Sequence, residues 1–265
     1  EKIRKVADEH HYDIEGIEII NPVNSDKNDI YVQELFRMRQ RKGTTVESAT
    51  NRMKQANYFG AMMVHFGDAD AMISGITSAY PWTLRPALKI IGRDPKYKKV
   101  SGMYIVSSKK GTYFLADTSV NIDPDSEAIA DIALQAADFV TNFDLTPRVA
   151  LLSYSNFGGV KGESASKMKT ALDIIKSRNP ELIVDGEMQA DTALSMDKIN
   201  EVFPFSTLKR PANVLVFPNL DSGNIAYKLL NRIGGARTIG PVLQGLSKSV
   251  HILQRGADSS EILDM

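Results

Sequence analysis

The chain has 265 residues, 43% of them hydrophobic, and its 32 basic and 32 acidic side chains cancel. That length and composition suffice for one large α/β unit or two smaller lobes. The balanced charge gives no indication of a nucleic-acid partner, and no apolar run reaches the ~20 residues that a membrane span requires. The sequence contains no cysteine, which excludes disulfides, thiolate metal ligands and a cysteine nucleophile and is compatible with a reducing, cytoplasmic location.

The two ends of the sequence resemble the interior of a protein. No signal peptide is recognisable at the start, where residues 1–4 have the pattern of a helix body without an initial Met. The last residues, 262–265, have the pattern of a helix that has just begun. We therefore expect a piece of a longer protein.

Apolar, β-branched runs alternate with helical patterns along the chain. The two runs on either side of Lys109-Lys110-Gly111 predict a β-hairpin. Helices of this length between strands are typical of parallel sheets with crossover connections. The predicted strands, in chain order, are 17–20, 71–75, 101–107, 113–120, 149–153, 182–184, 214–217 and 250–253.

Three helices have clear signals in the sequence. Asp123-Pro124 predicts an N-cap followed by proline at the first helical position, and the residues beyond keep one apolar face. A second helix is predicted from Ser164, and a third over 224–233, ending at Gly234-Gly235. The turn-rich segments 92–95 and 234–241 are the best candidates for boundaries between two lobes.

A cationic segment, 35–43, ends another predicted helix and contains Arg37, Arg39, Arg41 and Lys42. Such charges are commonly a solvated face that interacts favourably with the helix dipole. The alternative is a phosphate clamp, because the planar fork of arginine matches phosphate oxygens.

Two further arginines have the same two interpretations. Arg85 precedes a proline and an apolar helix, which predicts a place near a helix N-terminus, where anions are also favoured. Arg255 follows the last predicted strand and precedes a glycine, a suitable position for meeting an anionic ligand. A lone arginine is more often structural or solvated.

Two loops follow predicted strands at the edge where α/β proteins bind ligands. Segment 153–159 includes Ser155 and Asn156, but matches neither the dinucleotide fingerprint nor the phosphate loop, so a serine-capped turn is the plainer interpretation. Asp185, Glu187 and Asp191 form an acidic cluster that suggests a metal. Carboxylates after strands commonly cap the next helix, and the four histidines lack metal-ligand spacing, so we expect no metal here.

Taken together, these segments resemble the phosphate acetyltransferase (phosphotransacetylase) family over almost the whole chain. The family's first strand, its opening glycine-rich turn and its final helix have no counterpart here. The motifs that carry the resemblance are 69–75, 85–91, 116–118, 121–124, 240–245 and 250–256. The motifs that look like the version fused to bacterial NADP-dependent malic enzymes are 75–81, 152–158, 184–191 and 224–230.

The resemblance implies a two-lobed α/β fold of the isocitrate/isopropylmalate dehydrogenase-like type, with mostly parallel sheets and flanking helices. Lobe I is expected to comprise 1–95 and 241–265, and lobe II, inserted into it, 96–240. A homodimer that binds acetyl-CoA in the cleft between lobes is implied as well. The residues expected at the ligand are Arg39, Arg85, Arg255, Gln254, Ser155 and Asn156. In the family, the arginines matched by Arg39 and Arg85 hold phosphates of coenzyme A, and the one matched by Arg255 lies beside the acyl group.

Two positions depart from the family pattern. Gln254 stands where transferases carry a serine that orients the acyl carbonyl, and Glu261 where they carry the aspartate proposed as base for the thiol. A base must lie within ~2.6–3.2 Å of its proton, so one extra methylene changes its reach.

These departures predict a pocket that binds acetyl-CoA without efficient turnover. We therefore expect a regulatory domain, acting in cis on a malic enzyme whose catalytic part uses NADP and Mg²⁺ or Mn²⁺, with higher homo-oligomers in the whole protein. An active phosphate acetyltransferase is the alternative, and a purely structural dimerisation unit is a third. No nucleic acid or membrane partner is expected.

Overall fold

The computed structural model describes residues 2–265 and separates into two compact units, one ending at Phe59 and the other Gly60–Met265. The first unit is helical: α1 (Lys2–His10), α2 (Asn28–Arg39), the 3-10 helix η1 (Gln40–Lys42), α3 (Val46–Met53) and the start of α4 (Ala56–Phe66). Helix α2 packs on α3, and the rings of Tyr31 and Phe59 lie 5.1 Å apart.

The strand predicted over 17–20 is wrong, because this segment belongs to no helix or strand. Its apolar residues meet no neighbouring strand, and the side chain of Ile17 is 62% exposed. A run of β-branched residues forms a strand only where a partner satisfies its backbone groups and covers its side chains.

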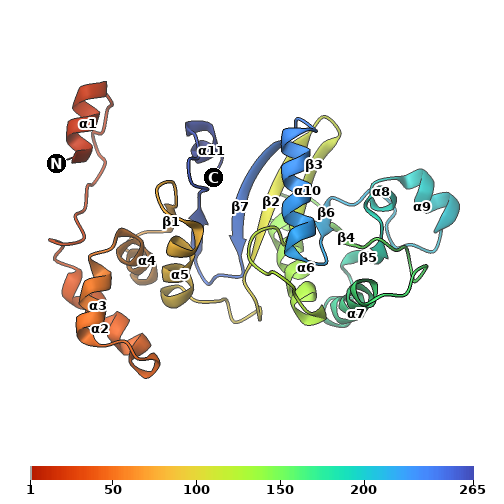
Figure 1. Ribbon diagram of the computed structural model, residues 1–265, viewed down its shortest axis with the longest axis horizontal. Helices are drawn as coiled ribbons and strands as arrows, with labels where there is room; N and C mark the ends of the chain where they lie inside the picture. Colours follow the sequence, from red (N-terminus) through yellow and green to blue (C-terminus); the bar gives the residue numbers. More distant parts are fainter. Residues whose placement is uncertain (1) are drawn as a thin grey trace. The chain divides into compact units, whose positions relative to one another are not determined.

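A six-stranded mixed sheet organises the second unit (Figure 1). Its order is β5-β4-β6-β3-β2-β7, with parallel pairs from β5 to β3 and antiparallel pairs from β3 through β2 to β7. The strands are β2 (Ser101–Ser108), β3 (Gly111–Ala116), β4 (Arg148–Leu152), β5 (Ile183–Met188), β6 (Val214–Val216) and β7 (Arg237–Gln244). The predicted α/β class and the β2–β3 hairpin are confirmed.

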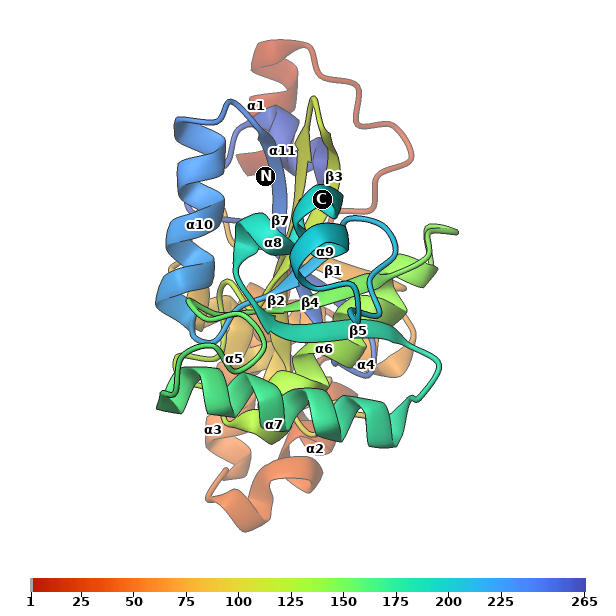
Figure 2. The same ribbon diagram turned by 90° about the vertical axis from the view of Figure 1, so that its right-hand side faces the viewer.

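Helices cover both faces of this sheet (Figure 2). Helices α6 (Ser126–Thr141) and α7 (Glu163–Arg178) form one core with the strand residues Val149 and Leu151. On the opposite face, Ala150 and Leu152 pack in a second core with residues of α8 (Ala190–Ala193), α9 (Met196–Val202) and α10 (Leu220–Arg232). The alternation along β4 follows from the two-residue period of a strand.

A separate two-stranded parallel sheet pairs β1 (Ala71–Ser74) with β8 (Ser249–Ile252). Helix α5 (Tyr80–Ile90) follows β1, and the short α11 (Ser259–Asp264) follows β8. The lobe boundaries at 95/96 and 240/241 stay a prediction, although β7 runs without interruption through Gly240. Within residues 2–265, no helix has the length and apolarity needed to cross a bilayer.

Two helix starts differ from those predicted. The N-cap of α6 is Asp125, whose side chain accepts a 2.8 Å hydrogen bond from the backbone N–H of Ala128, and not Asp123. Helix α10 begins earlier than 224, at Leu220, because the side chain of Asn219 caps it through the N–H of Ser222. Both caps use short polar side chains that accept from the first turn.

Candidate active site

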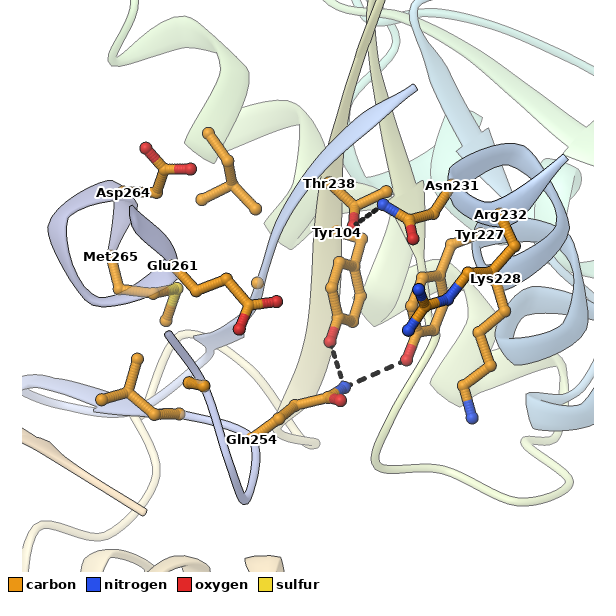
Figure 3. A pocket seen from close by; sticks show the side chains of 14 residues that line it. Tyr104, Tyr227, Lys228, Asn231, Arg232, Thr238, Gln254, Glu261, Asp264 and Met265 are labelled. Carbon is orange, nitrogen blue, oxygen red and sulfur yellow. Dashed lines mark hydrogen bonds between the residues drawn. The ribbon is translucent and has the colours of Figure 1, made fainter. Parts of the chain in front are cut away.

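A cavity of about 210 Å³ lies in the second unit, between the β7–α10 region and the segment that follows β8 (Figure 3). It brings together two positions predicted from sequence, Gln254 and Glu261. The other residues around it are Tyr104, Tyr227, Lys228, Asn231, Arg232, Thr238, Ile239, Gly240, Leu253, Ala257, Asp264 and Met265. The cavity therefore combines aromatic, cationic and acidic side chains from β2, β7, α10 and α11.

Two tyrosines form one wall of this cavity. The rings of Tyr104 and Tyr227 stack with centroids 3.8 Å apart and an interplanar angle of 12°. Both residues are buried, and burial raises the pKa of the Tyr104 hydroxyl, which is therefore neutral at physiological pH. Gly240 permits the close approach of β7, since a Cβ there would lie 3.0 Å from the Tyr104 ring, and its φ of 146° suits glycine.

The side chain of Gln254 links the two tyrosines. Its amide nitrogen donates a hydrogen bond to the Tyr104 hydroxyl and a 3.1 Å hydrogen bond to the Tyr227 hydroxyl (Figure 3). The backbone of this loop is held by β1, because Leu253 N–H donates to the Ser74 carbonyl at 2.8 Å. Gly75 allows that contact, since a Cβ at this residue would meet the Leu253 carbonyl oxygen at 2.3 Å.

Helix α11 forms the opposite side of the cavity. Asp258 and Glu261 make a capping box: the Asp258 side chain accepts from Glu261 N–H at 2.9 Å, and the Glu261 carboxylate accepts from Asp258 N–H at 3.0 Å. Asp264 forms a bidentate ion pair with Arg237 on β7, with one N–O distance of 2.9 Å. Glu261 is thus held at the cavity by one of its oxygens.

Cations line the helical side of the cavity. Lys228 and Arg232 lie one turn apart on α10, and the Lys228 ammonium is 5.9 Å from the centre of the Tyr227 ring. The carboxylates across the cavity are Glu261 and Asp264. The two cations can therefore bind an anionic ligand, and a carboxylate across the cavity can exchange a proton with it.

The three arginines predicted to contact the ligand lie on different elements of the structure. Arg255 is exposed and follows Gln254 directly, but does not itself line the cavity. Arg85 is exposed in the middle of α5, so its predicted place at a helix N-terminus is wrong; α5 begins at Tyr80 and continues through Pro86. Arg39 belongs to the first unit, at the end of α2, and its Nε is buried without a hydrogen-bond partner among residues 2–265.

The predicted loop at Ser155 and Asn156 does follow β4 and precede α7. Ser155 is buried and its hydroxyl donates to Glu187 at 3.3 Å, while Glu187 also accepts from Gly158 N–H at 2.6 Å. Asn156 exchanges two hydrogen bonds with Gln189. These bonds fix the loop to the end of β5, and neither Ser155 nor Asn156 lines the cavity.

The acidic cluster is dispersed among different partners. Asp185 accepts from Ser206 and Thr207, Glu187 from the loop just described, and Asp191 pairs with Lys198, whose hydrogen bond lowers the pKa of Asp191. The expectation that Asp185 and Glu187 cap a helix is wrong, since both lie within β5 and α8 has Gln189 as N-cap. In residues 2–265, no three His, Asp or Glu side chains gather as a potential metal site.

Comparison with known proteins decides the family. The phosphate acetyl/butaryl transferase family matches residues 1–265. The chain belongs to this family. It is 40% identical over 252 residues to a phosphate acetyltransferase from Nitratidesulfovibrio vulgaris, covering 95% of this chain and 36% of that protein. It is 38% identical over 264 residues to a phosphate acetyltransferase from Bacillus subtilis, covering 100% of this chain and 81% of that protein.

Solved structures agree with the sequence relatives. A phosphotransacetylase from Streptococcus pyogenes superposes with a TM-score of 0.93 at 36% identity, over 98% of this chain and 79% of that one. The predicted phosphate acetyltransferase-like α/β fold is thereby confirmed.

The relatives overturn the interpretation as a malic enzyme domain. They are named phosphate acetyltransferases, so the malic enzyme and oxidoreductase assignments are wrong, as is the expectation of a non-catalytic regulatory module. The inference rested on the malic-enzyme-type motifs, on the start of the sequence within a helix pattern, and on Gln254 and Glu261. The two changed side chains leave the cavity and its cations in place. The expectation of NADP and a divalent metal concerned a separate catalytic part, and nothing in this chain tests it.

The tyrosine pair is the feature of the site that sequence reasoning missed. Tyr227 lies within segment 224–230, one of the motifs assigned to the version fused to malic enzymes, but Tyr104 lies in a buried strand, where an aromatic residue is usually part of the core. One property could have indicated Tyr104. A buried tyrosine normally needs a hydrogen-bond partner for its hydroxyl, and that need points to a polar neighbour.

Proposed function

We propose that this chain is the catalytic domain of a phosphate acetyltransferase, which moves an acetyl group between the thiol of coenzyme A and inorganic phosphate. The observation that carries the proposal is the cavity in which Gln254, Glu261 and the α10 cations meet, in a chain whose relatives share that name over its whole length. Acetyl-CoA and phosphate are its proposed ligands.

The reaction is a direct acyl transfer. A phosphate oxygen forms a bond to the thioester carbonyl carbon, and the carbonyl π electrons move to oxygen. The resulting oxyanion collapses, the carbon–sulfur bond breaks, and the electron pair leaves on the thiolate, which takes up a proton. In the reverse direction the thiol loses this proton before it attacks acetyl phosphate.

The charged residues receive separate roles in this proposal. Lys228 and Arg232 neutralise phosphate oxygens at the cavity, because ammonium and guanidinium groups make strong charge-assisted hydrogen bonds to them. Glu261 exchanges the thiol proton through the carboxylate oxygen that the capping box leaves free. Arg255, which follows Gln254 but does not line the cavity, is given a role beside the reacting acyl group on the basis of the family resemblance alone.

Phosphate binding by Arg39 and Arg85, and ligand contacts by Ser155 and Asn156, remain proposals from the family resemblance. A homodimer and a cytoplasmic location are proposed on the same basis, with no nucleic acid or membrane partner.

The test is formation of acetyl phosphate by the purified chain from acetyl-CoA and inorganic phosphate, followed by release of free thiol. We expect turnover that depends on both substrates and falls at least tenfold in Arg255→Ala. Lys109→Ala, at an exposed lysine of the β2–β3 turn that does not line the cavity, is the control. A folded chain that makes no acetyl phosphate at saturating substrates contradicts the proposal.

A further inference from the structure

The stacked tyrosines have hydrogen-bonding capacity that the protein leaves unused. The amide nitrogen of Gln254 can only donate, so the Tyr104 and Tyr227 oxygens act as acceptors in their bonds to it. Each hydroxyl therefore keeps its own proton. One proton can lie between the two neighbouring oxygens, and the other has no protein acceptor among the described residues.

We infer that Tyr104 and Tyr227, oriented by Gln254, present to the cavity the one hydroxyl proton that is not held between them, and that this proton binds the carbonyl oxygen of the thioester and stabilises its developing negative charge. The inference rests on the proposed function and adds to it the groups that hold the reacting oxygen. Both tyrosines line the cavity, and Figure 3 shows their hydroxyl ends meeting at the Gln254 amide.

The pair has the rigidity that such a role requires. Tyr104 and Tyr227 are 3% and 5% exposed, and their stacked rings allow little rotation of either side chain. Gln254 fixes both hydroxyl oxygens from one nitrogen, so the donors are positioned before a ligand arrives. Preorganised donors stabilise a transition state because no reorganisation is needed when charge develops.

The protonation state of the pair also fits. Burial raises the pKa of Tyr104, so its hydroxyl remains a donor at neutral pH. A neutral donor does not compete with the cations of α10 for phosphate. The carboxylate of Glu261, on the other side of the cavity, is an acceptor only and cannot supply this hydrogen bond.

In the acyl transfer, the pair acts on one atom only. As phosphate oxygen bonds to the carbonyl carbon, the π electrons move to the carbonyl oxygen, where the hydroxyl proton is donated as a hydrogen bond and is not transferred. When the carbon–sulfur bond breaks, those electrons return to the carbonyl and the hydrogen bond weakens. The tyrosines end the cycle unchanged.

Turnover of Tyr104→Phe, Tyr227→Phe and the double variant tests this inference, because phenylalanine keeps the stack and removes only the hydroxyls. Loss of an oxyanion donor typically lowers kcat by about 10²–10³-fold. We expect a fall of at least tenfold in the double variant, with the KM for acetyl-CoA changed less than threefold. Tyr113→Phe, whose hydroxyl lies on the exposed hairpin, is the matched control.

A second readout does not depend on turnover. The infrared stretch of acetyl-CoA labelled with ¹³C at the carbonyl should shift to lower frequency when bound to the wild-type chain, and this shift should vanish in the double variant. An inactive wild-type chain that still shows the shift rejects the proposed function alone.

Three results overturn the inference itself: a shift that persists in the double variant, an unshifted carbonyl in the wild-type complex, or failure of acetyl-CoA to bind. A raised KM for phosphate without loss of the carbonyl shift would assign the hydroxyls to phosphate instead.

Discussion

At the level of single residues, Gln254 decides which way the tyrosine protons point. Its amide nitrogen occupies the acceptor sites of both hydroxyls. Gln254→Glu keeps the size and the hydrogen bonds but reverses their direction, because a carboxylate accepts where an amide nitrogen donates. The hydroxyl protons would then turn from the cavity to residue 254.

We therefore expect Gln254→Glu to fold like the wild type and to lose at least tenfold in kcat at pH 7. Steady-state acetyl phosphate formation and circular dichroism measure the two properties. Gln33→Glu, the same change at an exposed position of α2, is the control for added charge. Unchanged kcat in Gln254→Glu would show that proton direction at this position does not matter.

A second residue-level prediction concerns acid stability. His251 on β8 has a buried Nδ1 with no hydrogen-bond partner in the described part of the chain, and burial lowers the pKa of its imidazole. The unfolded chain, with a histidine pKa of about 6.5, then binds the proton more readily than the folded chain. The stability from neutral His251 is present above pH ~6.5 and is lost as the pH falls below the unfolded value.

His251→Gln should therefore show a smaller loss of unfolding free energy between pH 7.5 and 5.5 than the wild type. Urea titrations at the two pH values measure the difference, with His10→Gln on the exposed α1 as control. An equal loss in His251→Gln and wild type would exclude His251 as a source of acid sensitivity.

At the level of elements, the loop after β4 depends on one carboxylate from β5. Glu187 is 2% exposed and accepts from Gly158 N–H and the Ser155 hydroxyl, and that hydroxyl accepts from Val160 N–H. Truncation of Glu187 would leave the buried Ser155 hydroxyl without this acceptor, whereas the N–H of the exposed Gly158 can bond to water. Each such unsatisfied group costs about 1–3 kcal/mol.

We expect Glu187→Ala to lower the free energy of unfolding by about 1–3 kcal/mol and to increase amide exchange over 153–160. Urea unfolding and hydrogen exchange provide the measurements. Glu181→Ala, an exposed glutamate just before the same strand, should change neither. Wild-type exchange in the Glu187→Ala loop would mean that backbone turns alone hold it.

Some strands of the six-stranded sheet are easier to predict from sequence than others. Strands β4 and β6 are buried on both faces and read as continuous apolar runs, which is why they were predictable. Strand β7 was missed because it begins with the polar residues Arg237 and Thr238 and has Gly240-Pro241 at its centre, which suggested a lobe boundary. It is the last strand in the sheet order, and proline is tolerated in edge strands because no neighbour needs its missing N–H.

Only part of the candidate site could be predicted from the sequence. Gln254 and Glu261 belong to one short segment after β8, and both were identified as departures from the family pattern. Tyr104 and Tyr227 come from a strand and a helix far apart in sequence, and only the fold stacks them. Hydrogen bonds between distant segments leave no periodic pattern in a sequence.

At the level of the whole molecule, a ligand that binds only the folded chain must stabilise it against unfolding. For one site, acetyl-CoA at a hundred times its Kd adds about 2.7 kcal/mol. A domain of this size then gains roughly 5–11 °C in Tm, because a change of 1 kcal/mol shifts Tm by roughly 2–4 °C for domains of about 150–250 residues. Inorganic phosphate alone should give a smaller gain.

Arg255→Ala provides the decisive comparison for this effect. Loss of a hydrogen bond to a charged group costs about 1.5–3 kcal/mol, equivalent to a roughly tenfold or greater rise in Kd. At a fixed acetyl-CoA concentration the rise in Tm should therefore shrink in this variant and stay unchanged in Lys109→Ala. An equal rise in both variants would show that acetyl-CoA binds without the guanidinium beside Gln254, and the charged part of the proposed site would have to be sought elsewhere.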